Sequence, residues 1–211
     1  MGDLDAIREI IASCTYYINN LEAYNRSSEL EKKVIHTYPY LILSLNSMWS
    51  LAIVDLCKVL SKRKNDAYRL RAFINYLHNS YKSIKWKNPI TKDQLNGHLL
   101  EIEHKEEMIR DLKTLRDEQI AHSGRDIEIK FVSLEIVKPL LHLCQEIFNE
   151  LSFSIAGSTT CWRYSDYDLI SPLIESLVKF QEIEELTFQN LKKHQNKIDT
   201  DEILKIIRAN S

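Results

Sequence analysis

Apolar positions recur every three or four residues along most of the chain, which is the spacing of helices that bury one face. The predicted helices are 4–24, 38–60, 67–81, 92–122, 138–151 and 171–193, with a short element after residue 28 and a last short helix at 199–208. Residues 127–133 alternate in polarity, but one extended strip makes no sheet. Residues 152–168 form the longest stretch without a helical pattern. The chain therefore reads as a series of helices with one long loop.

Residues with capping chemistry mark where several of these helices begin. The expected caps, in chain order, are Ser28 with Glu31, Asn65 or Asp66, Thr91 with Gln94, and Ser171 followed by Pro172. Pro139 fits the first turn of a helix that starts near Lys138. Ser123–Gly124 ends the helix 92–122, because glycine readily adopts the left-handed conformation that closes a helix.

Residues 38–60 form the most apolar stretch and are apolar on nearly every face. Such a helix is either the central helix of a bundle or a membrane span. Asp55 and Lys58 weigh against the span, because a charge at bilayer depth costs about 2.5–3.5 kcal/mol. We expect the central helix and no membrane partner; a membrane-associated helical protein stays open as a weaker alternative.

Composition narrows the fold class further. The 211 residues include four Gly and four Pro, where average usage gives about 15 and about 10. So few turn formers argue against a β-sandwich, a β-barrel and a Rossmann domain. The expected fold is all-α, with a helical bundle at 1–151 and a loop plus C-terminal helical appendage at 152–211. A net charge of −2 leaves nucleic-acid binding to a local patch.

Several kinds of chemistry are missing from the sequence. It has no Gly-rich phosphate loop, no H-E-x-x-H, no calcium loop and no nucleophile elbow. The four cysteines form no C-x-x-C pair, and His98 and His104 lie about 120° apart on a helix. We therefore expect no metal and no cofactor. The acidic start lacks the basic region of a signal peptide, which predicts a cytoplasmic protein.

The segment TLRDEQIAHSGRD at 114–126 combines Arg116, Asp117 and His122 at the end of a long predicted helix. It resembles the HEPN superfamily, whose mark is Arg-x(4–6)-His near the end of the third or fourth helix of an α-bundle, with a polar residue after the Arg. The helices SLAIVDLCKVL and RLRAFINYL strengthen the likeness, which is closest to the abortive-infection branch and covers about residues 5–150. A HEPN-type helical bundle is the fold that this resemblance implies.

The spacing alone is weak evidence, because Arg71 and His78 also fit it. That pair lacks the polar companion and the glycine stop, so context favours Arg116 and His122. A purely structural interpretation stays open. In it, Arg116 and Asp117 are surface ion-pair partners, and His122 simply favours the negative end of the helix dipole.

The resemblance implies a metal-independent endoribonuclease that uses the ribose 2′-OH as nucleophile. His122 would be the base and Arg116 would hold the phosphate, while Asp117 would orient one of them or only accept from the helix surface. Arg125, Lys62 and Arg63 are candidate RNA contacts or only solvated basic turns. Some HEPN toxins carry a modified Tyr two positions after the His; Gly124 stands there, so that control is not expected.

Arg116 and His122 lie about 9 Å apart along a helix and about 120° around it. One helix end cannot easily close both on one phosphate, so a two-fold homodimer is expected. The other expected partners are an RNA substrate and an antitoxin or another defence-system protein. The alternative function is a catalytically silent helical module that binds a protein or RNA.

Overall fold

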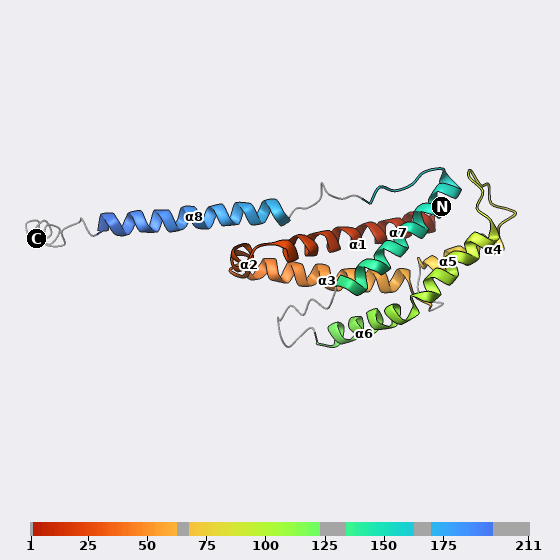
Figure 1. The fold of residues 1–211 in the computed structure, drawn as a ribbon, viewed down its shortest axis with the longest axis horizontal. Helices are drawn as coiled ribbons and strands as arrows, with labels where there is room; N and C mark the ends of the chain where they lie inside the picture. The colour runs from red at the N-terminus through yellow and green to blue at the C-terminus, as the bar shows by residue number, and fades with distance from the viewer. Residues whose placement is uncertain (1, 63–67, 123–133, 163–169, 196–211) are drawn as a thin grey trace, which may run out of the picture.

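The computed structural model describes residues 2–62, 68–122, 134–162 and 170–195 (Figure 1). These residues form eight helices and no strand: α1 (Gly2–Arg26), α2 (Glu29–His36), α3 (Pro39–Val59), α4 (Leu70–Asn79), α5 (Lys92–His104), α6 (Glu106–His122), α7 (Leu134–Ala156) and α8 (Ile170–Gln195). The all-α prediction is confirmed. The alternating strip at 127–133, the Ser123–Gly124 stop and the helix predicted at 199–208 lie outside the described residues.

Helix α3 is the centre of the bundle, in contact with α1, α2, α6 and α7. Eight of its side chains are buried, among them Trp49, Ile53 and Leu56. Among the described helices, α3 is the one that is long and apolar enough to cross a membrane. Its buried face forms the core of the bundle, so the predicted central helix is confirmed.

The two predicted capping boxes are confirmed. The side chain of Ser28 accepts from the backbone N–H of Glu31, and Thr91 accepts from that of Gln94. The predicted start of α4 at residue 67 is wrong, because Tyr68 has a left-handed backbone (φ 63°) and Arg69 is the N-cap. Asn65 and Asp66, the predicted caps, lie outside the described residues.

The predicted helix 92–122 is in fact two helices, broken at Lys105. The backbone there leaves the helical region (φ −97°, ψ 12°), and α6 begins one residue later. A guanidinium nitrogen of Arg71 on α4 lies 3.2 Å from the carbonyl oxygen of Ile102 in the last turn of α5. At the break this carbonyl therefore has two donors, the guanidinium of Arg71 and the backbone N–H of Lys105 at 3.3 Å.

Helix α7 is longer than predicted at both ends: it begins at Leu134 and continues to Ala156. Pro139 therefore lies in its second turn. The C-terminal extension is stabilised by the segment before α5, whose Lys87 and Asn88 donate backbone N–H groups to the carbonyl of Ser154, at 3.0 and 3.1 Å. Gly157 (φ 73°) ends the helix in the left-handed conformation that glycine favours.

Helix α8 contacts α1 and α2 through its first half and then extends beyond the bundle (Figure 1). It begins at Ile170, so Ser171 and Pro172 lie inside its first turn and not at the predicted N-cap and N1 positions. Ile174 is buried against the bundle, and the amide of Gln181 lies 3.4 Å from the hydroxyl of Thr37. From residue 182 to 193 every residue is exposed.

Candidate functional site

Helix α6 carries the candidate site on its C-terminal half. Ile109, Leu112 and Leu115 recur at helical spacing and are buried in the core, which fixes the rotation of the helix. Arg116 follows at the edge of this buried face, with 23% of its side chain exposed. The guanidinium is therefore held beside the bundle and is not an extended surface arginine.

Asp117 binds Arg116 directly. The guanidinium Nε and Nη2 atoms of Arg116 both donate to Oδ1 of Asp117, at 2.8 and 2.6 Å. The sequence leaves open whether Asp117 orients Arg116 or His122 or only accepts from the helix surface, and the structure shows it in contact with Arg116. A charged side chain fixed by two hydrogen bonds loses less freedom when it binds a phosphate, because part of its ordering has already occurred.

The positive charge of Arg116 also reaches the central helix. Burial raises the pKa of the Cys57 thiol on α3 to about 11, and the nearby charges of Arg116 and Lys113 oppose that rise. The thiol lies 3.8 Å from the carbonyl oxygen of Leu112. The last turn of α3 therefore packs against the second half of α6, close enough for the charge of Arg116 to act on the thiol.

His122 is the last residue of α6, six positions after Arg116. Its side chain lies outside the described residues, as do Arg63 and Arg125. Lys62 is described and pairs with Glu106, with Nζ 3.0 Å from Oε2. Glu106 opens α6, ten residues before Arg116, or about 15 Å along the helix. The structure thus places Lys62 at the opposite end of α6 from Arg116.

Arg71, the first residue of the second Arg-x(4–6)-His pair, is more deeply buried than Arg116. Only 10% of its side chain is exposed. It donates to the carbonyl of Ile102 and to Glu106, with N–O distances of 3.2 and 2.9 Å. These contacts join α4 to the junction of α5 and α6. Arg71 is therefore a buried structural clamp.

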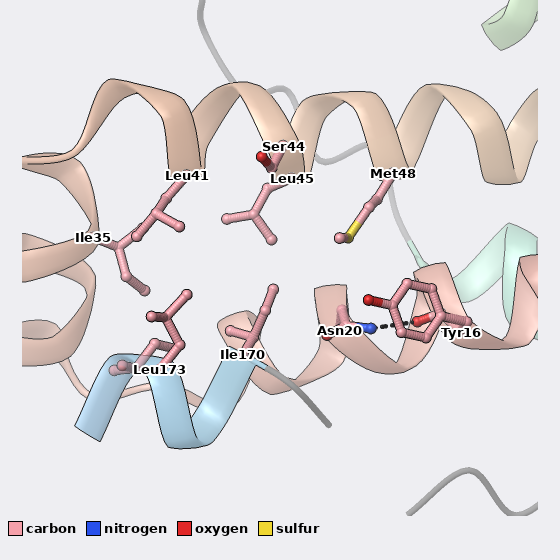
Figure 2. A pocket seen from close by; sticks show the side chains of 10 residues that line it. Tyr16, Asn20, Ile35, Leu41, Ser44, Leu45, Met48, Ile170 and Leu173 are labelled. Atoms are coloured by element: carbon pink, nitrogen blue, oxygen red, sulfur yellow. Dashed lines mark hydrogen bonds between the residues drawn. The ribbon is translucent and has the colours of Figure 1, made fainter. Parts of the chain in front are cut away.

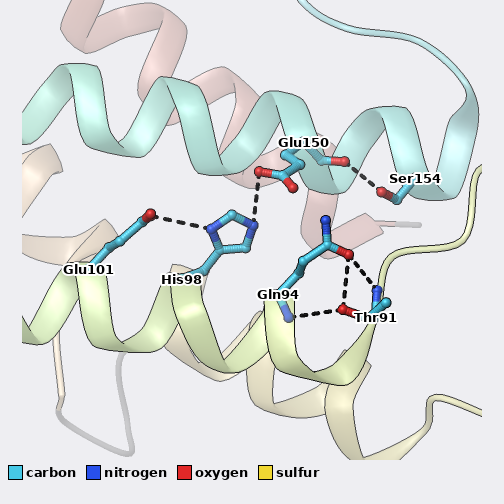
Figure 3. A network of polar contacts seen from close by, with 6 residues as sticks. All are labelled: Thr91, Gln94, His98, Glu101, Glu150 and Ser154. Carbon is cyan, nitrogen blue, oxygen red and sulfur yellow. Dashed lines mark hydrogen bonds and ion pairs between the residues drawn. The ribbon is translucent and has the colours of Figure 1, made fainter.

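A polar network that the sequence did not predict lies between α5 and α7 (Figure 3). The imidazole of His98 is 7% exposed and lies between Glu101, 3.4 Å from Nδ1, and Glu150, 3.2 Å from Nε2. The only sign of this network in the sequence is the polar residue His98 within the pattern of a predicted helix. Among the described residues, no group of His, Cys, Asp or Glu is arranged to hold a metal ion. The network joins two helices and lies apart from Arg116.

A small apolar pocket of about 190 Å³ lies where α8 meets the bundle (Figure 2). It is lined by Tyr16, Asn20, Ile35, Leu41, Ser44, Leu45, Met48, Ile170, Leu173 and Ile174. Asn20 is buried and donates to the carbonyl of Tyr16 at 2.8 Å, while its side-chain oxygen has no partner. The pocket lies along the first half of α3, whereas Arg116 is near its last turn.

An all-α bundle whose α6 ends in Arg-Asp-x4-His is the combination that marks the HEPN class. The family model HEPN_AbiU2, described as AbiU2, matches residues 4–180, and the chain therefore belongs to this abortive-infection family. The match covers α1 to α7 and the first half of α8. No curated protein and no solved structure matches the chain significantly.

Proposed function

We propose that this HEPN protein is a metal-independent endoribonuclease of bacterial defence, a toxin that acts in the cytoplasm. The observation that carries the proposal is the orientation of Arg116 by Asp117, six residues before a histidine at the end of α6. A structural arginine such as Arg71 is buried in protein contacts. Arg116 is instead partly exposed at the helix end that carries the family's mark.

The chemistry needs only these side chains and the RNA. The neutral imidazole of His122 takes the proton of a ribose 2′-OH, because a histidine pKa lies near working pH. The 2′-oxygen then forms a bond to the adjacent phosphorus, and the bond to the 5′-oxygen breaks. That oxygen leaves with a proton, which gives a 2′,3′-cyclic phosphate and a 5′-OH. The guanidinium of Arg116 binds the phosphate oxygens as negative charge gathers on them.

A homodimer completes the proposed site. Arg116 and His122 lie about 120° apart around α6, so a two-fold axis near the helix end would bring the Arg of one copy toward the His of the other. In this arrangement the imidazole of the second copy, in its protonated form, gives its proton to the leaving 5′-oxygen. An antitoxin or another defence-system protein would restrain such an enzyme. Requirement for the 2′-OH makes RNA the substrate and excludes DNA.

The test is cleavage of RNA by the purified chain in EDTA, together with toxicity on expression. His122→Ala should lose about 10²–10⁴ in rate, the usual contribution of a positioned base. Arg116→Lys should also fail, because an ammonium cannot make the paired contact to phosphate oxygens. His142→Ala and Arg110→Lys are matched controls, since both side chains are about 70% exposed in local ion pairs. Cleavage by His122→Ala at the parent rate would leave a binding module as the function.

A further inference from the structure

Lys113 lies one turn before Arg116 on α6 and is half-buried. At about 100° and 1.5 Å per residue, the two side chains leave the helix about 60° and about 4.5 Å apart. Helix α6 packs on α3, which carries Cys57 (Figure 1). Burial raises the pKa of the Cys57 thiol, and the charges of Arg116 and Lys113 both oppose that rise. The two cations therefore lie beside each other, on the side of α6 that faces this thiol.

The charge of Lys113 has no partner in this part of the helix. The formal charges of Arg116 and Asp117 cancel, because the two side chains form a hydrogen-bonded ion pair. Arg110, the cation one turn earlier, is already in a local ion pair. Among the described residues Lys113 forms no ion pair, and Asp111 projects about 160° away from it around the helix. Lys113 thus adds one positive charge to an otherwise neutral pair at the candidate site.

A second phosphate of the RNA fits this charge. Phosphate contacts supply most of the affinity of proteins for nucleic acids, and a lysine ammonium is a compact charge on a flexible stem. The forked donors of Arg116 suit the phosphate that reacts. Lys113 lies one turn further from the end of α6, where the proposed two-fold axis would pass. We propose that Lys113 binds the RNA phosphate next to the reacting one, an assignment that rests on the nuclease function proposed above.

Binding of a single-stranded RNA oligonucleotide with 2′-O-methyl groups measures this contact without cleavage, because the proposed nucleophile is blocked. Each phosphate contact on a single strand adds about 0.7 to the slope of the logarithm of the binding constant against that of the salt concentration. Lys113→Gln should therefore lower the slope by about 0.7 and weaken binding about fivefold at about 0.1 M salt. Lys113→Arg keeps the charge and should bind like the parent. Circular dichroism should show the parent helix content for both variants.

Lys105→Gln is the matched control. Lys105 is also half-buried and forms no ion pair with a described residue, but it lies before the start of α6. Its replacement removes the same charge and should leave the slope at the parent value. An unchanged slope in Lys113→Gln would mean that the ammonium binds no phosphate. Equal losses of slope at Lys113 and Lys105 would mean a general effect of charge, and either result overturns the proposal.

Single-turnover cleavage distinguishes a neighbouring phosphate from the reacting one. A contact that is equally strong in the ground state and the transition state changes the RNA concentration that gives half the maximal rate, and not the maximal rate itself. Lys113→Gln should raise that concentration about fivefold at about 0.1 M salt and keep the maximal rate, whereas Arg116→Lys should lose the maximal rate. A loss of maximal rate in Lys113→Gln like that in Arg116→Lys would place Lys113 on the reacting phosphate and overturn the proposal.

The same measurements separate this contact from the nuclease function itself. A parent that cleaves RNA while Lys113→Gln keeps the parent slope would overturn the contact alone. A parent that binds the 2′-O-methyl RNA but does not cleave unmodified RNA would overturn the nuclease function, and the slopes would still decide whether Lys113 contacts a phosphate. A parent that neither binds nor cleaves RNA would overturn both.

Discussion

Replacing Arg71 by Met should destabilise the bundle while leaving RNA cleavage intact. Methionine retains much of the apolar stem and removes the guanidinium that joins α4 to the α5–α6 junction. The carbonyl of Ile102, now 3.2 Å from a charged donor, would lose that partner. This change separates the two Arg-x(4–6)-His pairs of the sequence, because the same loss at Arg116 should instead abolish cleavage.

The expected cost follows from two contacts of the guanidinium and from its Nε, which has no hydrogen-bond partner. A hydrogen bond from a charged donor to the buried carbonyl contributes about 1.5–3 kcal/mol. The ion pair with Glu106 adds at most about 1 kcal/mol, because that carboxylate is 39% exposed and screened by water. The buried Nε of Arg71 has no hydrogen-bond partner, so its removal returns about 1 kcal/mol. The net loss is about 2 kcal/mol.

Urea denaturation followed by circular dichroism measures this loss, and the melting temperature should fall by about 4–8 °C for a chain of this size. Arg110→Met is the control. Its side chain is 71% exposed and its pair with Glu107 is local, so its effect should stay within about 0.5 kcal/mol. If Arg71→Met matched this control, the clamp would contribute nothing and the assignment of Arg71 as structural would be refuted.

Three further changes test other parts of the structure. Phe148→Ala should cost about 3–5 kcal/mol in urea denaturation, because the ring is fully buried against Trp162; a loss below about 1 kcal/mol would contradict this packing. At pH 8 a chromogenic disulfide reagent should titrate Cys161 alone in the folded chain and all four thiols in guanidinium, because the other three thiols are buried and burial raises their pKa, to about 11 for Cys57. Rapid reaction of two or more thiols in the folded chain would contradict this burial. Asp117→Asn should slow RNA cleavage with unchanged helix content, and a parent-like rate would remove its positioning role.

Periodicity and capping chemistry predicted most of the helices, because both are local properties of the sequence. Ser28 with Glu31 shows this: three residues apart, they complete a hydrogen-bonded box without help from the rest of the chain. The break at Lys105 could not be predicted this way. The carbonyl of Ile102 beside the break accepts from Arg71, which lies 31 residues earlier in the chain, and such a distant contact is not a local property of the sequence.

The same difference between local and distant contacts applies to the candidate site. Arg116, Asp117 and His122 are neighbours in sequence, and their place at the end of α6 followed from the motif and its context. The partners of His98 could not be predicted from the motif or its context, because Glu150 comes from α7, more than 50 residues later. The charge of Lys62 predicts an RNA contact, yet the position of Lys62 beside Glu106 depends on how α3 and α6 pack.

The contact between the segment before α5 and the end of α7 also determines how this part of the molecule opens. Lys87 and Asn88 lie outside any helix, and the amides of such residues usually exchange with solvent almost freely. Here both are bonded to the carbonyl of Ser154, so their hydrogens are released only when the segment and the last turn of α7 separate. These two amides should therefore exchange at one common rate, slower than those of ordinary loops, and report the free energy of that local opening.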